Sequence, residues 1–221
     1  MTIDYAKARH AMVEQQVRPW WVLDARVLDV LARLPRAEVV PEAYRAVAYA
    51  VREIPLGHGQ HMLKPVVAGR ALHNLLPQDG EEVLEIGTGS GYVSACLGEL
   101  ARDVVSLEQV PELAEAARNR LRALGASNVT VENADAFSWE TQRRFDAIFV
   151  TAAVDQVPAR FLQWLKPGGR MFVVHGRAPA MEAVLVHRGE GGDVNAGRTQ
   201  SLFDTELGYL AGAEPATEFQ L

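Results

Sequence analysis

Cysteine and runs of basic residues are the scarcest features of this 221-residue chain. It contains one cysteine, Cys96, so no internal disulfide can form, and a reducing compartment is expected. Acidic residues outnumber basic ones by 28 to 22, for a net charge of −6, and no basic stretch is longer than Arg143-Arg144. A surface for nucleic acid or for an anionic membrane is therefore not predicted.

Long apolar runs are missing too. No run approaches membrane-spanning length, and residues 1–10 carry charges where a signal peptide has its apolar core. The hydrophobic content of 48% is nevertheless enough for one substantial core. We expect a soluble, cytoplasmic chain folded as a single domain over residues 1–221, with an N-terminal helical and loop region at 1–76 and a core at 77–221.

The first 76 residues predict helices separated by proline-containing connections. Helical spacing indicates a helix over 4–17 that Pro19 ends, a second helix that starts at Asp24, and two more over 42–49 and 66–76. The segment 54–65 contains two prolines and two glycines. We expect it to be an irregular, structured loop.

From residue 82 onward, strands and helices alternate. Strands are predicted at 83–86, 104–108, 129–132, 145–151 and 170–175. Between them, one helix is predicted to end near residue 101, and two more are predicted over 111–124 and 158–165. This pattern is typical of βαβ units in a mostly parallel, doubly wound α/β sheet. Two last strands at 183–187 and 199–205, joined by a loop at 189–197, predict an antiparallel finish.

The stretch from Glu82 to Tyr92 predicts a nucleotide-type site. An apolar run ends abruptly in Gly-Thr-Gly-Ser-Gly, which indicates a buried strand, a turn too tight for Cβ atoms and the start of a helix. Such a turn lets a ligand reach bare backbone and the free N–H groups of the helix. The dinucleotide fingerprint requires glycine where this chain has Tyr92, so a nicotinamide cofactor is the weaker interpretation.

The actual pattern resembles the first motif of S-adenosylmethionine-dependent methyltransferases with a seven-stranded Rossmann-like fold. This resemblance spans roughly residues 82–175 and implies S-adenosyl-L-methionine as the cofactor. It implies that the turn holds the methionine part and that an acid before it helps to place the ammonium group. The cofactor-binding candidates in this stretch are Glu85, Gly87, Thr88, Gly89, Ser90 and Gly91.

Two further acids follow neighbouring strands. Glu108 ends the second strand, where ribose hydroxyls require an acceptor, and Asp135 follows the third. The resemblance implies that an acid at the position of Asp135 accepts a hydrogen bond from the adenine amino group. Their neighbours Gln109 and Ala136 complete the candidate cofactor site. The alternative interpretation is that both acids are helix caps or solvated side chains.

Over most of its length the chain is similar to the protein-L-isoaspartate O-methyltransferase family. The segments 54–60, 83–92 and 145–153 carry this resemblance. It implies methyl transfer to the α-carboxylate of L-isoaspartyl residues in damaged proteins, which starts their repair. A carboxylate is already anionic at pH 7, so no general base is required, and catalysis would be mostly alignment.

The loop after Gly59-Gln60 departs from the family pattern. The family typically continues with Thr-Ile-Ser-x-Pro, whereas this chain has His61-Met62-Leu63-Lys64-Pro65. Leu63 removes a hydroxyl, and losing one hydrogen bond to a charged group costs about 1.5–3 kcal/mol. The substrate-positioning candidates are His61, Leu63 and Thr151, with His61 or Lys64 as replacement donors. Two alternatives stay open: another methyl acceptor, or a non-catalytic protein that binds S-adenosylmethionine.

Three other groups of residues have simpler explanations. His58, His61 and His73 lack a nearby Cys or acid at ligand spacing, so no metal site is predicted. Cys96 lies among apolar residues and is expected to be buried rather than nucleophilic. The Trp20-Trp21 pair beside Pro19 is interpreted as a packing anchor in preference to a peptide groove. The sequence predicts neither an oligomeric state nor a role for the tail at 206–221.

Overall fold

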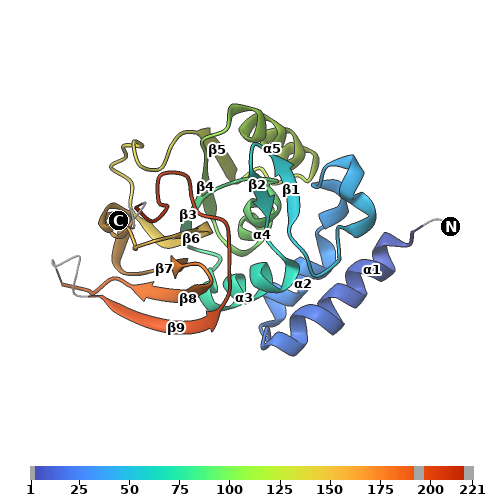
Figure 1. The fold of residues 1–221 in the computed structure, drawn as a ribbon, viewed down its shortest axis with the longest axis horizontal. Helices are drawn as coiled ribbons and strands as arrows, with labels where there is room; N and C mark the ends of the chain where they lie inside the picture. Colours follow the sequence, from blue (N-terminus) through green and yellow to red (C-terminus); the bar gives the residue numbers. More distant parts are fainter. Residues whose placement is uncertain (1–2, 192–196, 217–221) are drawn as a thin grey trace, which may run out of the picture.

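The computed structural model describes residues 3–191 and 197–216, and these residues form a seven-stranded sheet with helices around it (Figure 1). The strand order is β5-β4-β3-β6-β7-β8-β9. The first five strands in this order are parallel, and β8 and β9 are antiparallel. The strands are β3 (Glu82–Ile86), β4 (Asp103–Glu108), β5 (Val129–Asn133), β6 (Phe145–Val154), β7 (Leu165–Arg177), β8 (Ala180–His187) and β9 (Arg198–Asp204). The predicted α/β sheet and its antiparallel finish are confirmed.

Both faces of the parallel strands are covered. Successive side chains of a strand point to opposite faces, so Val83 packs into one hydrophobic cluster and Leu84 into another. Residues of α3 (Pro65–Leu75), α4 (Tyr92–Leu100) and α5 (Pro111–Ala123) contribute to the first cluster. Phe161 of α6 (Ala159–Gln163) contributes to the second. The sheet is therefore doubly wound, as the alternation of strands and helices predicts.

The N-terminal region is helical, as predicted, with two differences. The first helix, α1 (Tyr5–Met12), is shorter than expected and continues as π and 3-10 turns to Trp20. The second, α2 (Ala25–Arg33), begins where expected because the Asp24 side chain accepts hydrogen bonds from the backbone N–H groups of Arg26 and Val27. The helix expected over 42–49 is a 3-10 helix at Glu42–Val47.

The expectation of an irregular loop over 54–65 was wrong. The segment forms an antiparallel hairpin of β1 (Ile54–Gly57) and β2 (Gln60–Met62), in which Ile54 pairs with Met62. Gly57, His58 and Gly59 all have positive φ and form the turn. Both strands of a two-stranded sheet are edge strands, so Pro55 is tolerated. The glycines and the proline therefore shape the hairpin instead of preventing it.

The packing role predicted for Trp20 and Trp21 was wrong as well. Their side chains are 55% and 75% exposed. The backbone of Trp21 is left-handed at the turn before α2, and Val22 is the residue buried there. Trp20 contacts the Arg70 guanidinium, 5.8 Å from the ring centroid.

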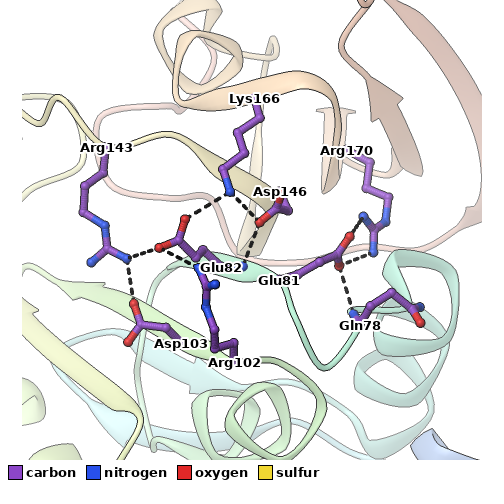
Figure 2. Close-up of polar contacts among 9 residues, drawn as sticks. All are labelled: Gln78, Glu81, Glu82, Arg102, Asp103, Arg143, Asp146, Lys166 and Arg170. Atoms are coloured by element: carbon purple, nitrogen blue, oxygen red, sulfur yellow. Dashed lines mark hydrogen bonds and ion pairs between the residues drawn. The ribbon is translucent and has the colours of Figure 1, made fainter.

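A network of ion pairs connects the amino ends of the parallel strands (Figure 2). Lys166 Nζ lies 3.0 Å from Glu82 Oε2 and 2.8 Å from Asp146 Oδ2. Arg143 Nη2 lies 2.6 Å from Asp103 Oδ2 and 3.3 Å from Glu82 Oε1. The hydrogen bond from Lys166 lowers the pKa of Glu82. Since partly exposed pairs stabilise little one by one, their effect comes from the network.

A second part of this network connects β7 to the end of α3. Arg170 donates to both carboxylate oxygens of Glu81 at 2.8 Å, in the bidentate geometry visible in Figure 2. It also donates to the carbonyl oxygens of Leu75 and Leu76. Charged side chains therefore hold together the amino ends of the parallel strands.

The tail pairs with β6 near the opposite end of the strands, where the parallel strands have their carboxyl ends. Ala153 N donates to Gly208 O at 2.9 Å, and Leu210 N donates to Ala153 O at 2.7 Å. The loop predicted at 189–197 and the tail at 206–221 lie partly outside the described residues, at 192–196 and 217–221. Among the described residues, none of the helices has the length and apolar character needed to span a bilayer.

Candidate active site

The glycine turn between β3 and α4 is built so that no Cβ could be added at its first position. Gly87, Gly89 and Gly91 have φ values of 96°, 53° and 82°. A Cβ on Gly87 would overlap the Thr151 hydroxyl, and one on Gly89 would lie 3.1 Å from Leu56 Cδ1. The turn therefore presents bare backbone to the cavity beside it.

Thr151, a candidate for substrate positioning, contacts the backbone of this turn from β6. Its hydroxyl is 2.7 Å from the carbonyl oxygen of Gly87 and 3.0 Å from that of Ile86. The residue belongs to β6 and also lines the cavity. Thr151 thus supports the turn and borders the space where a ligand would lie.

Glu108 lies at the same edge, at the end of β4. Its Oε2 accepts from Gly89 N at 2.8 Å and its Oε1 accepts from Val110 N at 3.0 Å. Val110 is the N-cap residue of α5, so the carboxylate connects the glycine turn with the start of that helix. Glu108 also lines the cavity, which keeps both the capping and the ligand-binding interpretations available.

Glu85 is not beside the cavity. The sequence placed it next to the cofactor, but the structure places its carboxyl group behind the turn, fully buried. One carboxyl oxygen contacts the hydroxyls of Ser94 and Ser106, and the other has no partner. Burial raises the pKa of Glu85 to about 8, so the group is mostly protonated at pH 7.

Asp135 and its neighbour also lie outside the cavity lining. The Asp135 carboxylate is exposed and accepts from Phe137 N at 2.9 Å, as in the capping interpretation. Ala136 is buried in the second hydrophobic cluster, and Gln109 is exposed. The lining includes residues 87–90, Glu108 and Thr151 of the predicted site, but not Glu85, Gly91, Gln109, Asp135 or Ala136.

The hairpin forms the other wall of the cavity. Leu56, Gly59, Gln60 and His61 line it, as does Leu63 just after β2. Leu63 is only 6% exposed, whereas His61 is exposed. The substrate-positioning candidates His61, Leu63 and Thr151 therefore border the same space as the glycine turn.

Sequence reasoning missed several residues of this cavity. Arg36, Glu53, Tyr92 and the tail residues 207–210 also line it. Arg36 could have been noticed as a charge in a connector that also contains Val39 and Val40, both buried. No motif indicates the tail residues, which reach the site through their pairing with Ala153.

The histidines are not arranged as a metal site, and the cysteine is not placed to act as a nucleophile. His58 and His61 lie on the hairpin segment, whereas His73 lies on α3 with its Nδ1 3.4 Å from Asp24 N. Residues 3–191 and 197–216 contain no group of three side chains arranged for a metal ion. Cys96 is fully buried, as predicted, and burial raises the pKa of its thiol.

The seven-stranded, mostly parallel sheet with antiparallel β8 and β9, together with the glycine turn after β3, matches the fold of Rossmann-like methyltransferases. Within this class, residues 7–202 match the model of the protein-L-isoaspartate(D-aspartate) O-methyltransferase family. The chain belongs to this family, whose members depend on S-adenosylmethionine.

Individual relatives agree with this assignment. The chain is 44% identical over 193 residues to protein-L-isoaspartate O-methyltransferase 2 of Syntrophobacter fumaroxidans, covering 86% of this chain and 76% of the relative. It is 47% identical over 165 residues to the Myxococcus xanthus protein-L-isoaspartate O-methyltransferase, covering 74% and 78%. A Plasmodium falciparum protein solved with S-adenosyl-L-homocysteine has a TM-score of 0.77 over 95% of this chain and 99% of its own. That structure is 16% identical, so it supports the fold alone.

We expect Gly87→Ala to weaken binding of S-adenosylhomocysteine by at least about tenfold, because the alanine needs a strained backbone and overlaps Thr151. Calorimetric titration measures the change. Gly80→Ala is the matched control, since Gly80 has open space around it and an ordinary φ. Adding Thr151→Ala to Gly87→Ala should restore part of the affinity. Unchanged affinity in Gly87→Ala would show that the ligand does not use this turn.

Glu85 predicts a specific pH dependence of stability. Its folded pKa of about 8 is above the ordinary 4.5, so the folded protein holds this proton more tightly than the unfolded chain does. The stabilisation is complete below pH 4.5 and is lost as the pH rises through 8. Relative to wild type, Glu85→Gln should gain roughly 2–4 kcal/mol in the free energy of unfolding between pH 5 and pH 8. Urea unfolding at several pH values tests this, and parallel curves for the two proteins would contradict it.

Proposed function

We propose that this chain transfers a methyl group from S-adenosyl-L-methionine to the α-carboxylate of L-isoaspartyl residues in damaged proteins. The observation that carries the proposal is the single cavity shared by the hairpin and the glycine turn, where Leu56 approaches Gly89. Membership of the isoaspartate methyltransferase family supports the class of acceptor. A cofactor on the glycine turn and a peptide under the hairpin would thus meet in one place.

The residues of the turn fit the cofactor. S-adenosylmethionine supplies an electrophilic methyl group on a positively charged sulfur. The backbone of residues 87–90 is open to the cavity, and Glu108 has lone pairs left to accept from ribose hydroxyls. Glu85 and Gly91 would act indirectly by holding the turn from behind. The adenine contact of Asp135, with Gln109 and Ala136 beside it, stays a prediction from the sequence.

Methylation of a carboxylate depends on the alignment of its oxygen with the methyl group and requires no proton transfer from the acceptor. An α-carboxylate is ionised at pH 7, so its oxygen is already a nucleophile. The work of the protein is to hold this oxygen in line with the methyl carbon and to exclude other geometries. Residues 59–63 border the cavity across from the turn, and Thr151 borders it next to Gly87, which supports a role for them in this alignment.

The second candidate is a methyltransferase that acts on a different acceptor. Leu63 supports it, because this apolar side chain lines the cavity where the family typically has a serine. Lys64 is absent from the lining, and its ammonium lies 3.8 Å from the Glu53 carboxylate. His61 is therefore the remaining replacement donor in this loop.

One assay separates the candidates. Purified protein is incubated with labelled S-adenosylmethionine and with an isoaspartyl peptide or its normal aspartyl twin, and the base-labile methyl ester is followed. We expect labelling of the isoaspartyl peptide only. Cofactor binding without any labelling would favour another acceptor or a non-catalytic role. Failure to bind the cofactor would overturn all three interpretations.

We expect His61→Ala to lower kcat/KM for the isoaspartyl peptide by about tenfold, the cost of one lost hydrogen bond to a charged group. Lys64→Ala should stay within about twofold of wild type, because Lys64 does not line the cavity. Initial rates at saturating cofactor measure both effects. Equal rates for His61→Ala and wild type would remove His61 from the substrate site.

Two broader features complete the proposal. We treat residues 1–221 as one domain, in which region 1–76 and core 77–221 work together. A hydrophobic cluster with members from Met12 to Leu207 supports this organisation. The cytoplasmic location stays a prediction from the sequence.

A further inference from the structure

Arg36 is a buried cation between the two halves of the cavity. It lies in the connector after α2, and its side chain is completely buried. Its Nε donates to Ala48 O at 2.8 Å and its Nη2 donates to Leu63 O at 2.6 Å. Its guanidinium carbon lies 5.0 Å from the ring centroid of Tyr92, the first residue of α4. One side chain thus contacts both Leu63, just after the β1–β2 hairpin, and the helix that follows the glycine turn.

The charge of Arg36 is only partly compensated. Within the described residues its hydrogen-bond partners are carbonyl oxygens and no carboxylate pairs with it, and Nη1 is buried without a hydrogen bond. Burial lowers the pKa of Arg36 to about 10, so the group is still charged at pH 7. A buried charge is costly unless paired, and two carbonyl groups and one ring face offset only part of this cost. The site therefore gains from an anion nearby.

The charges around the cavity make this requirement specific. Arg36 is the only Lys or Arg among the described residues of the lining, which also includes the carboxylates of Glu53 and Glu108. A peptide that brings a third carboxylate would be repelled by Glu108, and by Glu53 in part, because Lys64 Nζ lies 3.8 Å from the Glu53 carboxylate and offsets some of its charge. A positive charge behind Leu63 counters this repulsion on the side where the acceptor would enter.

We propose that Arg36 is the positioning residue that makes this cavity favour a carboxylate acceptor, by holding the Leu63 backbone and placing a positive charge behind it. The inference rests on the proposed function and deepens it, because it explains how the cavity distinguishes a free carboxylate from a neutral group. Arg36 acts through the loop and through its electric field. It needs no direct contact with the substrate.

The test compares equilibrium binding of two peptides in the presence of saturating S-adenosylhomocysteine. One carries the isoaspartyl residue with a free α-carboxylate, and its twin carries an α-carboxamide. For the wild type we expect the carboxylate peptide to bind at least about tenfold more tightly. In Arg36→Met the ratio of the two affinities, carboxylate peptide over carboxamide peptide, should fall to about twofold or less. Arg36→Lys should keep most of this preference.

The ratio separates a charge effect from a structural one. If Arg36 only held the loop, Arg36→Met would weaken both peptides equally and the ratio would stay at its wild-type value. Arg45→Met is the matched control, because it removes a neighbouring charge that donates to Ala37 O and lies outside the cavity lining. This control should bind both peptides as the wild type does.

Each remaining outcome has a clear meaning. A wild-type protein that binds the two peptides equally overturns the role of Arg36 even if Arg36→Met does not fold. A wild-type protein that binds neither peptide overturns the proposed function as well. A clear wild-type preference that persists in a folded Arg36→Met overturns the inference alone.

Discussion

The parallel pairing of β3 with β4 and β6 is the constraint on which the site depends. Ile86 is paired with Leu107 on one side and with Val150 on the other. Because the three strands run in the same direction and in this register, the residues that follow them meet at one edge of the sheet. They are Gly87, Glu108 and Thr151, the residues directly after Ile86, Leu107 and Val150. A shift of one residue in either pairing would separate them and turn their side chains to the other face.

The same pairing explains the position of Glu85. In the ladder Glu85 stands opposite Ser106, which brings a hydroxyl to its carboxyl group, and Ser94 reaches it from α4. A protonated carboxyl can donate one hydrogen bond as well as accept others. The acid thus connects two strands and a helix immediately behind the turn. Its proposed contribution to ligand binding is to keep the backbone of the turn in place.

The parts of the fold that could be predicted from the sequence are those with local signals. The alternation of apolar strands with helices and the glycines after Ile86 identified the sheet, the turn and the edge where a ligand would lie. The hairpin was missed because prolines and glycines were interpreted as breakers of regular structure. In a two-stranded sheet, however, Pro55 has an edge position and the glycines supply the positive φ values of the turn.

Arg36 shows why the rest of the site could not be predicted. Its partners Ala48, Leu63 and Tyr92 are 12, 27 and 56 residues further along the chain, and no spacing rule relates such positions. The acids had the opposite difficulty. Their residue type and their place near strand ends indicated a ligand, yet of Glu85, Glu108 and Asp135 only Glu108 borders the cavity. Distinguishing it from Asp135 requires knowing how the segment after β5 turns away.

The charged network at the amino edge has a consequence for adaptation to temperature. The groups around Glu82 and Lys166, drawn in Figure 2, join the beginnings of the parallel strands. The glycine turn follows the other end of β3, so the two features lie at opposite ends of the same strands. The desolvation penalty of ion pairs falls as the temperature rises. Evolution toward a hotter or colder habitat could therefore add or remove charges at this edge while the residues around the cavity stay unchanged.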